Sequence, residues 1–252
     1  MARRTAVSIG IHGRTPADAV RALAPRLERL GFATLWINDV PGGDSLAGLR
    51  VAAEATTALG LATGVIPLDR RPVGDLDLSG LPADRTTLGI GSGGARRPLG
   101  LIEGGLAELR ERTKARLVVG ALGPRMRRLA AERADGVLLN WLSPAAAAEA
   151  DRELRRDAGE HAVRSILYVR TIADESARPA LEREAASYGA IPAYAANFAR
   201  LGITPLEATL DGPERLAGFE VVDELVLRAI TPTGSLAELE RFAETTATWL
   251  HA

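Results

Sequence analysis

The chain has 252 residues, of which 46% are apolar and 25% charged, a composition typical of a globular protein with a substantial core. Its formal net charge of −1 argues against general nucleic-acid binding, which requires an excess of basic residues. It has no cysteine, so disulfides, thiolate metal sites and cysteine nucleophiles are excluded. No apolar run reaches the roughly 18 residues of a membrane span, and we expect one cytoplasmic domain over residues 1–252.

The side-chain inventory limits the chemistry further. Lys114 is the only lysine, so Schiff-base or pyridoxal phosphate chemistry would have to place this one residue in the active site. With only three histidines a multi-histidine metal centre is not expected, and we predict no metal site.

Short apolar runs rich in Val, Ile and Leu alternate with helical patterns along almost the whole chain. Runs that are continuous rather than alternating are typical of parallel strands buried on both faces. Eight of them in a chain of this size predict a (β/α)8 barrel, a TIM barrel of the α/β class. The expected strands are Ala6–Ile11, Ala33–Ile37, Leu61–Ile66, Thr87–Gly91, Arg116–Gly120, Gly136–Asn140, Ser165–Thr171 and Glu224–Ile230.

Capping signals mark the first and last helices. Thr15 is expected to cap the first helix, with Pro16 at its first position and Pro25 introducing a kink. Ser235 and Glu238 have the spacing of a capping box, which predicts the start of the last helix.

Two segments break the regular alternation. Residues 69–86, between the third and fourth strands, contain two prolines and no helical period, so the third helix is expected to be missing or reduced to a turn. The long segment between the seventh and eighth strands carries helical patterns near Arg178–Tyr188 and Tyr194–Leu201, and is expected to form a lid or an oligomer contact.

In such barrels the active site lies at the carboxyl ends of the strands. The fifth strand is followed by Gly120–Met126, in which Gly123 precedes Pro124 at the start of a helix. Free N–H groups at a helix N-terminus bind phosphate well, and Arg125 would add a charge-assisted hydrogen bond. The same spacing also fits an ordinary capped turn.

The fourth strand ends in the glycine-rich Gly89–Gly94, which includes Gly91 and Ser92. A Rossmann site is rejected because this run follows the fourth strand and the residues after it open a helix poorly. The glycines either let a flat ring or phosphate approach the backbone or form a tight corner.

Asp39 ends the second strand and is expected to project into the barrel mouth, where it would accept a hydrogen bond from a ring N–H or a hydroxyl. The alternative is that Asp39 caps the following helix, although Asp44 and Ser45 are better placed for that role.

Other strand ends contribute fewer signals. Gly64 interrupts a β-branched run, which marks a bulge or a close backbone approach. His12, just past the first strand, is either a catalytic group or incidental. Asn140 and Trp141 end the sixth strand, where the indole would wall a ring pocket or pack on the next helix.

Four segments, in this order, resemble the bacterial luciferase-like monooxygenase superfamily: Leu30–Asp39, Thr63–Pro72, Leu88–Gly94 and Gly120–Asn140. The resemblance covers most of residues 1–145. It is closest to the branch of coenzyme F-420 reductases that includes methylenetetrahydromethanopterin reductase.

This resemblance implies a barrel that binds FMN or coenzyme F-420 at its mouth. Asp39 matches an acidic position near the ring, Thr63–Val65 match a bend that often holds a non-proline cis peptide, and Gly120–Met126 match the phosphate turn. The expected catalytic residues are Asp39 and His12. The expected cofactor-binding residues are Thr63, Gly64, Val65, Gly91, Ser92, Gly120, Gly123, Pro124, Arg125, Met126 and Asn140.

The chain also departs from the family pattern. Val40 stands where many members have histidine, the third helix is stripped, and the usual insertion between strands four and five is absent. We expect an oxidoreductase or monooxygenase acting on a small organic substrate, assembled as a homodimer. The alternative is a non-catalytic cofactor- or ligand-binding barrel. A phosphate-sugar isomerase or aldolase is disfavoured, because the chain lacks the lysine and the glutamate that such an enzyme would need at its strand ends.

Overall fold

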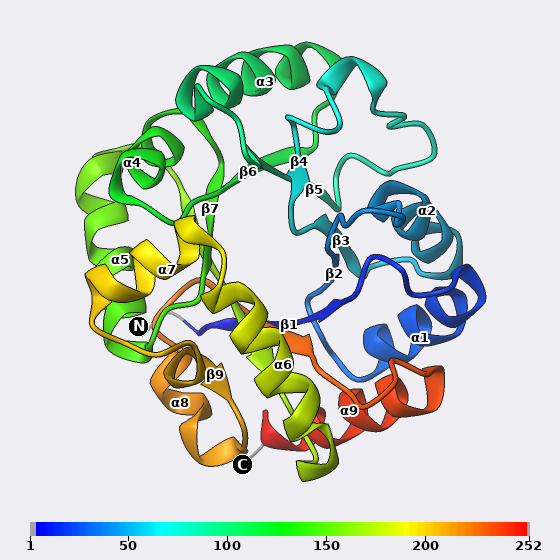
Figure 1. The fold of residues 1–252 in the computed structure, drawn as a ribbon. Coiled ribbons are helices and arrows are strands. Elements are labelled where there is room, and N and C mark those ends of the chain that lie inside the picture. Colours follow the sequence, from blue (N-terminus) through cyan, green and yellow to red (C-terminus); the bar gives the residue numbers. More distant parts are fainter. Residues whose placement is uncertain (1–3, 251–252) are drawn as a thin grey trace.

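Eight parallel strands close into a barrel in the computed structural model, which describes residues 4–250. Each barrel strand pairs with its neighbour, and the last pairs with both the seventh and the first, which completes the ring seen in Figure 1. The (β/α)8 prediction is therefore confirmed. The barrel strands are β1 (Ala6–Ile11), β2 (Thr34–Ile37), β3 (Gly60–Thr63), β5 (Thr86–Gly91), β6 (Arg116–Gly120), β7 (Gly136–Asn140), β8 (Arg164–Thr171) and β10 (Glu224–Ala229).

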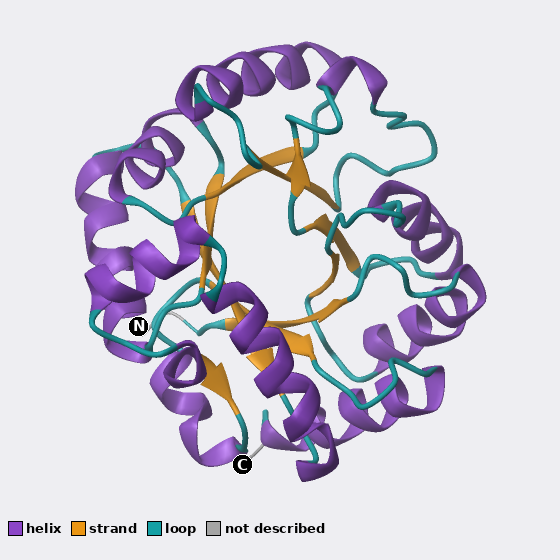
Figure 2. Ribbon diagram, viewed as in Figure 1, coloured by secondary structure: helices purple, strands orange, loops and turns teal. Residues whose placement is uncertain are grey.

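Helices form an outer ring around these strands (Figure 2). None of the helices among residues 4–250 is long and apolar enough to cross a membrane. The α-helices are α1 (Ala17–Arg29), α2 (Ser45–Ala55), α3 (Pro98–Arg112), α4 (Pro124–Arg133), α5 (Pro144–Ala158), α6 (Arg178–Gly189), α7 (Pro192–Leu201), α8 (Leu216–Phe219) and α9 (Leu236–Trp249).

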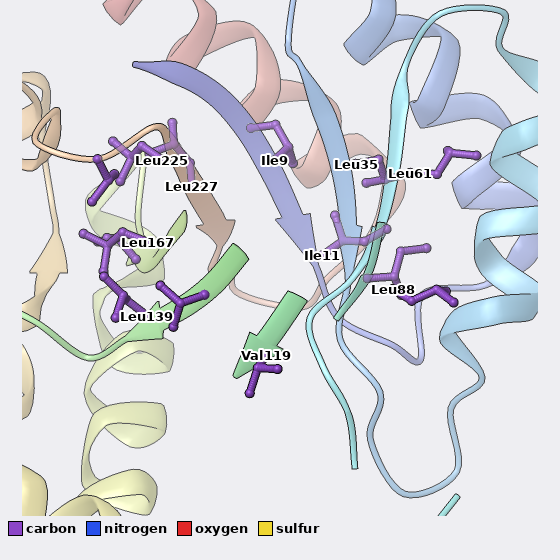
Figure 3. Packing of buried hydrophobic residues seen from close by; sticks show 14 of the residues in the cluster. Ile9, Ile11, Leu35, Leu61, Leu88, Val119, Leu139, Leu167, Leu225 and Leu227 are labelled. Carbon is purple, nitrogen blue, oxygen red and sulfur yellow. The ribbon is translucent and has the colours of Figure 1, made fainter. Parts of the chain in front are cut away.

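Strand alternation divides the barrel side chains into two sets. One set faces the helices and forms the main core, and Figure 3 shows Ile9, Leu35 and Leu167 among its members. The other set fills the lumen with the buried cluster Trp36, Ala62, Val118, Leu138, Ile166, Tyr168 and Val226, against which Val65 packs. The lumen is thus filled by side chains, as in other barrels of eight strands.

The third expected strand is shorter than the sequence indicated. β3 ends at Thr63, the peptide between Gly64 and Val65 is cis, and the chain resumes as β4 (Ile66–Pro67), which pairs with β5. The predicted continuous strand Leu61–Ile66 is therefore wrong at its end, because the backbone bends at Gly64. The seven other strands agree with their expected bounds to within one residue.

The two helix starts predicted from capping side chains differ in the structure. Ser235 and Glu238 form the expected capping box of α9. Thr15 does not cap α1, because Pro16 is the N-cap residue and the Thr15 hydroxyl donates to the carbonyl of His12 instead. Helix α1 continues through Pro25 to Arg29.

No α-helix separates β3 from β5, as the sequence predicted; the segment holds β4 and a single 3-10 turn, Val73–Asp75. A loop without helical hydrogen bonds needs other partners for its backbone. Arg112 of α3 supplies two of them by donating to the carbonyls of Val73 and Leu76.

Arg85, at the end of the same segment, ties it to helix α2. Its guanidinium donates to the carbonyls of Ala53, Thr56 and Leu59, at 2.9, 2.9 and 3.0 Å, and to the Thr56 hydroxyl at 2.9 Å. The carbonyls of Ala53 and Thr56 are among those that the end of α2 leaves without helical partners, so these bonds satisfy them.

Replacing Arg85 with methionine should therefore lower the free energy of unfolding by about 2 kcal/mol, because several charge-assisted hydrogen bonds are lost together. Urea denaturation measures this loss. The exposed Arg70→Met serves as the control and should change stability by less than about 0.5 kcal/mol. Equal effects of the two substitutions would contradict the bracing role of Arg85.

The segment between β8 and β10 contains α6, α7, α8 and the short strand β9 (Thr209–Leu210). The two predicted helical pieces correspond to α6 and α7. In Figures 1 and 2, α6 and α7 lie in front of the ring of strands, and α6 contributes Glu184 to groups on β8 and β10. The segment therefore covers part of the carboxyl end of the barrel.

Candidate functional site

The mouth of the barrel carries polar side chains that the sequence reading missed. Arg170 on β8 and Arg228 on β10 are register partners, and their side chains point into the lumen two residues above Tyr168 and Val226. Both arginines are almost completely buried. The sequence signal for these two residues is an arginine near the carboxyl end of each of two largely apolar strands. Active sites of such barrels are built at that end.

Glu184 of α6 lies between the two arginines. Its Oε1 accepts from Arg170 Nε at 2.9 Å, and its Oε2 is 4.0 Å from Arg228 Nη2. Burial alone would raise the pKa of this carboxyl, but Arg228 and Arg170 together hold the pKa below its ordinary value. Glu184 is therefore a carboxylate at neutral pH.

Arg170 is surrounded by aromatic rings and fully engaged. Its guanidinium carbon lies 4.2 Å from the Trp141 ring centroid and 4.6 Å from that of Tyr188, and it also donates to Asn140 Oδ1. Cation–π contacts of this kind are strongest where water is excluded. The predicted residue Asn140 thus lies in this cluster and orients Arg170.

His12 lies on the rim of the same cluster. Its Nδ1 accepts a hydrogen bond from the backbone N–H of Arg14 at 3.2 Å, so Nε2 carries the hydrogen in the neutral ring. Partial burial of the ring and the nearby positive charge of Arg228 lower the pKa of His12. At neutral pH the imidazole is therefore uncharged and presents a donor.

Asp39 lies apart from the arginine cluster. Its side chain accepts from Ser45 Oγ at 2.8 Å and forms an ion pair with Arg71 from the loop that replaces the third helix. Helix α2 is capped by Asp44, which accepts from the N–H groups of Leu46 and Ala47 at 3.0 and 3.2 Å. Asp39 is thus not the cap of this helix, and it links the end of β2 to the irregular segment.

The bend after β3 is held by one hydroxyl. Thr63 Oγ1 donates to the carbonyl of Gly89 and accepts from its N–H, both at 2.9 Å. Beyond the cis peptide, the Val65 side chain enters the space beside two glycines: a Cβ atom at Gly91 would lie 2.7 Å from Val65 Cγ2, and one at Gly120 would lie 3.1 Å from Val65 Cγ1. Three predicted elements, the bend, Gly91 and Gly120, are therefore in contact.

The loop after β5 has a more local role. Gly93 adopts a positive φ of 54°, and Gly94 donates its N–H to Asp69 Oδ2 at 2.8 Å, so this loop is held by the segment after β4. Ser92 precedes these glycines and is partly exposed.

Helix α4 begins as predicted, with Gly123 as its N-cap and Pro124 at the first position. No side chain among the described residues caps it, and nothing lies within 4 Å of a Cβ atom placed on Gly123. Arg125 is exposed and Met126 is packed against the core. The free N–H groups, the open space and the neighbouring guanidinium together fit a phosphate group.

Within the described part of the chain, no group of three or more His, Asp or Glu side chains could hold a metal ion.

Comparison with solved structures shows the same fold in redox enzymes. The coenzyme F420-dependent tetrahydromethanopterin reductase of Methanopyrus kandleri matches with a TM-score of 0.65 and 17% identity over 98% of both chains. An F420-dependent secondary alcohol dehydrogenase, in complex with an F420–acetone adduct, matches with a TM-score of 0.71 and 14% identity over 97% of this chain and 99% of its own. The chain has the fold of these enzymes.

An FMN-containing protein matches over a similar length. The oxygenating constituent of 3,6-diketocamphane monooxygenase from Pseudomonas putida, in complex with FMN, aligns with a TM-score of 0.66 and 15% identity over 96% of this chain and 97% of its own. No protein-family model matches the chain, and a search of curated proteins finds no match.

The packing of Val65 against Gly91 predicts a specific coupling. Gly91→Ala should destabilise the protein by about 1–3 kcal/mol, because the new methyl group overlaps Val65 in a packed lumen. The cost of Gly91→Ala should fall in a Val65→Ala background, as measured by a double-mutant cycle in urea. Gly94→Ala is the control, since its Cβ would approach nothing closer than 3.7 Å. A cost of Gly91→Ala that is the same in both backgrounds would contradict this packing.

The lowered pKa of His12 predicts a pH dependence of stability. Below the ordinary histidine value of 6.5, the unfolded chain binds a proton that the native His12 resists, so stability falls as the pH drops. Between pH 7.5 and pH 5, His12→Asn should lose less stability than the unsubstituted protein, as measured by chemical denaturation. Identical pH profiles would show that His12 titrates as in the unfolded chain.

Proposed function

We propose that this protein is an oxidoreductase of the luciferase-like type, which uses FMN or coenzyme F-420 on a small organic substrate at the carboxyl end of its barrel. The observation that carries the proposal is the likeness of fold, over nearly the whole chain, to F420-dependent and FMN-containing enzymes. The open, uncapped start of α4 and the packing of Val65 beside Gly91 and Gly120 support it, because they fit the phosphate and ring positions that the sequence resemblance implies.

Each part of the site has a proposed role. The N–H groups at the start of α4 and the Arg125 side chain bind the cofactor phosphate. Val65 and the adjoining bend form a wall of the mouth on which a flat ring packs. When bound, the cofactor supplies hydride transfer, or oxygen activation in the case of FMN.

The remaining groups orient and protect the reacting partners. The neutral His12 holds a hydrogen at Nε2 at the rim of the mouth, and the ion pair of the buried Asp39 with Arg71 keeps the irregular segment against β2. Helices α6 and α7 exclude water from one side of the mouth. The homodimer and the cytoplasmic location expected from the sequence stay predictions.

A second candidate is a barrel that binds a cofactor or ligand without turnover. The absence of an α-helix between β3 and β5 favours it, since that side of the mouth has less protein around it.

Fluorescence titration with FMN and with coenzyme F-420, each oxidised and reduced, tests the proposal. Gly123→Leu should weaken cofactor binding at least tenfold, because the side chain would fill the phosphate position, while it should change the free energy of unfolding by less than about 1 kcal/mol. Gly104→Leu in α3 is the matched control, because its Cβ also meets nothing within 4 Å. The proposal fails if neither cofactor binds to the folded protein, and tight binding without turnover of any substrate favours the second candidate.

A further inference from the structure

The barrel mouth holds more buried positive than negative charge. Arg170 and Arg228 stand beside one another on paired strands, with exposed fractions of 3% and 5%, and Glu184 is the carboxylate that contacts both. Neighbouring like charges on one sheet face repel, and a buried charge without a partner is costly. The cluster therefore carries one positive charge in excess.

The excess is located at Arg228. Arg170 has a short ion pair to Glu184, a bond to Asn140 and two stacked rings, whereas Glu184 is 4.0 Å from Arg228. Arg228 donates through Nη1 to the carbonyl of the next residue, Ala229, but its Nε finds no hydrogen-bond partner among residues 4–250. A buried guanidinium N–H is thus left free to bind an acceptor.

A second free donor lies close to it. The hydroxyl of Tyr168 is buried and has no hydrogen-bond partner in the described chain. It lies against Gly10, where a Cβ atom would come within 2.6 Å, and Gly10 is the register partner of Arg228 on β1. Burial raises the pKa of Tyr168 to about 12, although Arg228 and Arg170 act to lower it, so the hydroxyl keeps its hydrogen at neutral pH.

His12 adds a third donor at the rim. It directly follows the last residue of β1, two residues after Gly10, and its neutral ring presents Nε2–H. Two buried donors and one at the rim, with one surplus positive charge, match a ligand group that has acceptors only and one negative charge. A carboxylate has both properties, while a phosphate dianion would exceed the available charge beside Glu184.

We propose that Arg228, Tyr168 and His12 bind the carboxylate group of the substrate. That the ligand is a substrate rests on the function proposed above, whereas the existence of the anion site rests on the three donors and the surplus positive charge. The site restricts the small organic substrate to carboxylic acids and orients the acid group towards β1 and β10.

Carboxylate binding can be measured on the full chain without any cofactor. Acetate and benzoate are titrated by isothermal calorimetry against their neutral counterparts, acetamide and benzamide. At least one carboxylate should bind tenfold or more tightly than its amide, and it should raise the melting temperature progressively as its concentration exceeds its Kd. Probes of two sizes are used so that a mouth too narrow for the larger one does not conceal binding of the carboxylate group.

Three variants connect this binding to the named donors. Arg228→Met should abolish the preference for the carboxylate over the amide, and Tyr168→Phe should weaken carboxylate binding several-fold. Tyr168→Phe removes a hydroxyl that bonds to nothing in the described chain, so folding should be retained. Arg183→Met, at an exposed position next to Glu184 on α6, is the matched control and should bind as the unsubstituted protein does.

The proposal is overturned if neither carboxylate binds more tightly than its amide, or if Arg228→Met and Tyr168→Phe leave the preference unchanged. Inorganic phosphate binding more tightly than both carboxylates, with that binding lost in Arg228→Met, would also overturn it in favour of a phosphate site. Titration of the same sample with FMN and with coenzyme F-420 distinguishes a failure of the carboxylate site from a failure of the proposed function. Carboxylate binding without cofactor binding would support the anion site and contradict the proposed oxidoreductase function.

Discussion

The width of a closed eight-stranded barrel is the constraint on which the rest of this structure depends. Every second strand residue must point into a narrow lumen, where large side chains fit only beside small ones. Tyr168 and Val65 occupy the upper lumen because Gly10, Gly91 and Gly120 have no side chain there. The glycines near the mouth are therefore required by packing within the protein, whatever ligand the mouth also accepts.

The two ends of the lumen differ in how completely their polar groups are satisfied. At the amino end of the strands, Glu224 accepts from Ser8 Oγ at 2.7 Å and from Trp36 Nε1 at 2.8 Å, and it pairs with Arg164 at 3.1 Å. That cluster balances its charges and uses its donors internally, as a stabilising network should. At the mouth, Tyr168 and Arg228 retain donors without partners among residues 4–250, and this asymmetry supports the proposal that ligands bind at that end.

Segments outside the regular barrel complete the mouth on two sides. The helices between β8 and β10 bring Glu184 and Tyr188 against Arg170, which also stacks on Trp141 at the end of β7. On the opposite side, an irregular loop takes the place of a helix. Arg112 of α3 donates to the backbone of this loop, and Arg85 of the loop donates to carbonyls at the end of α2. The outcome is a mouth whose covered side is positively charged and aromatic and whose other side is built of loops.

The sequence by itself determined the barrel, because its signals are local. Continuous apolar runs, capping residues and the proline-containing segment 69–86 can each be recognised without knowing which residues meet in space. It also located the uncapped turn at Gly123 and the bend at Gly64. It did not reveal Arg170, Arg228, Glu184 and Tyr168, which are far apart in the chain or hidden within apolar strands. Only the tertiary structure decided their meeting, because strand register and the path of α6 set which inward positions share a level of the lumen. For the same reason the partner of Asp39, Arg71, could be found only once the loop was folded against β2.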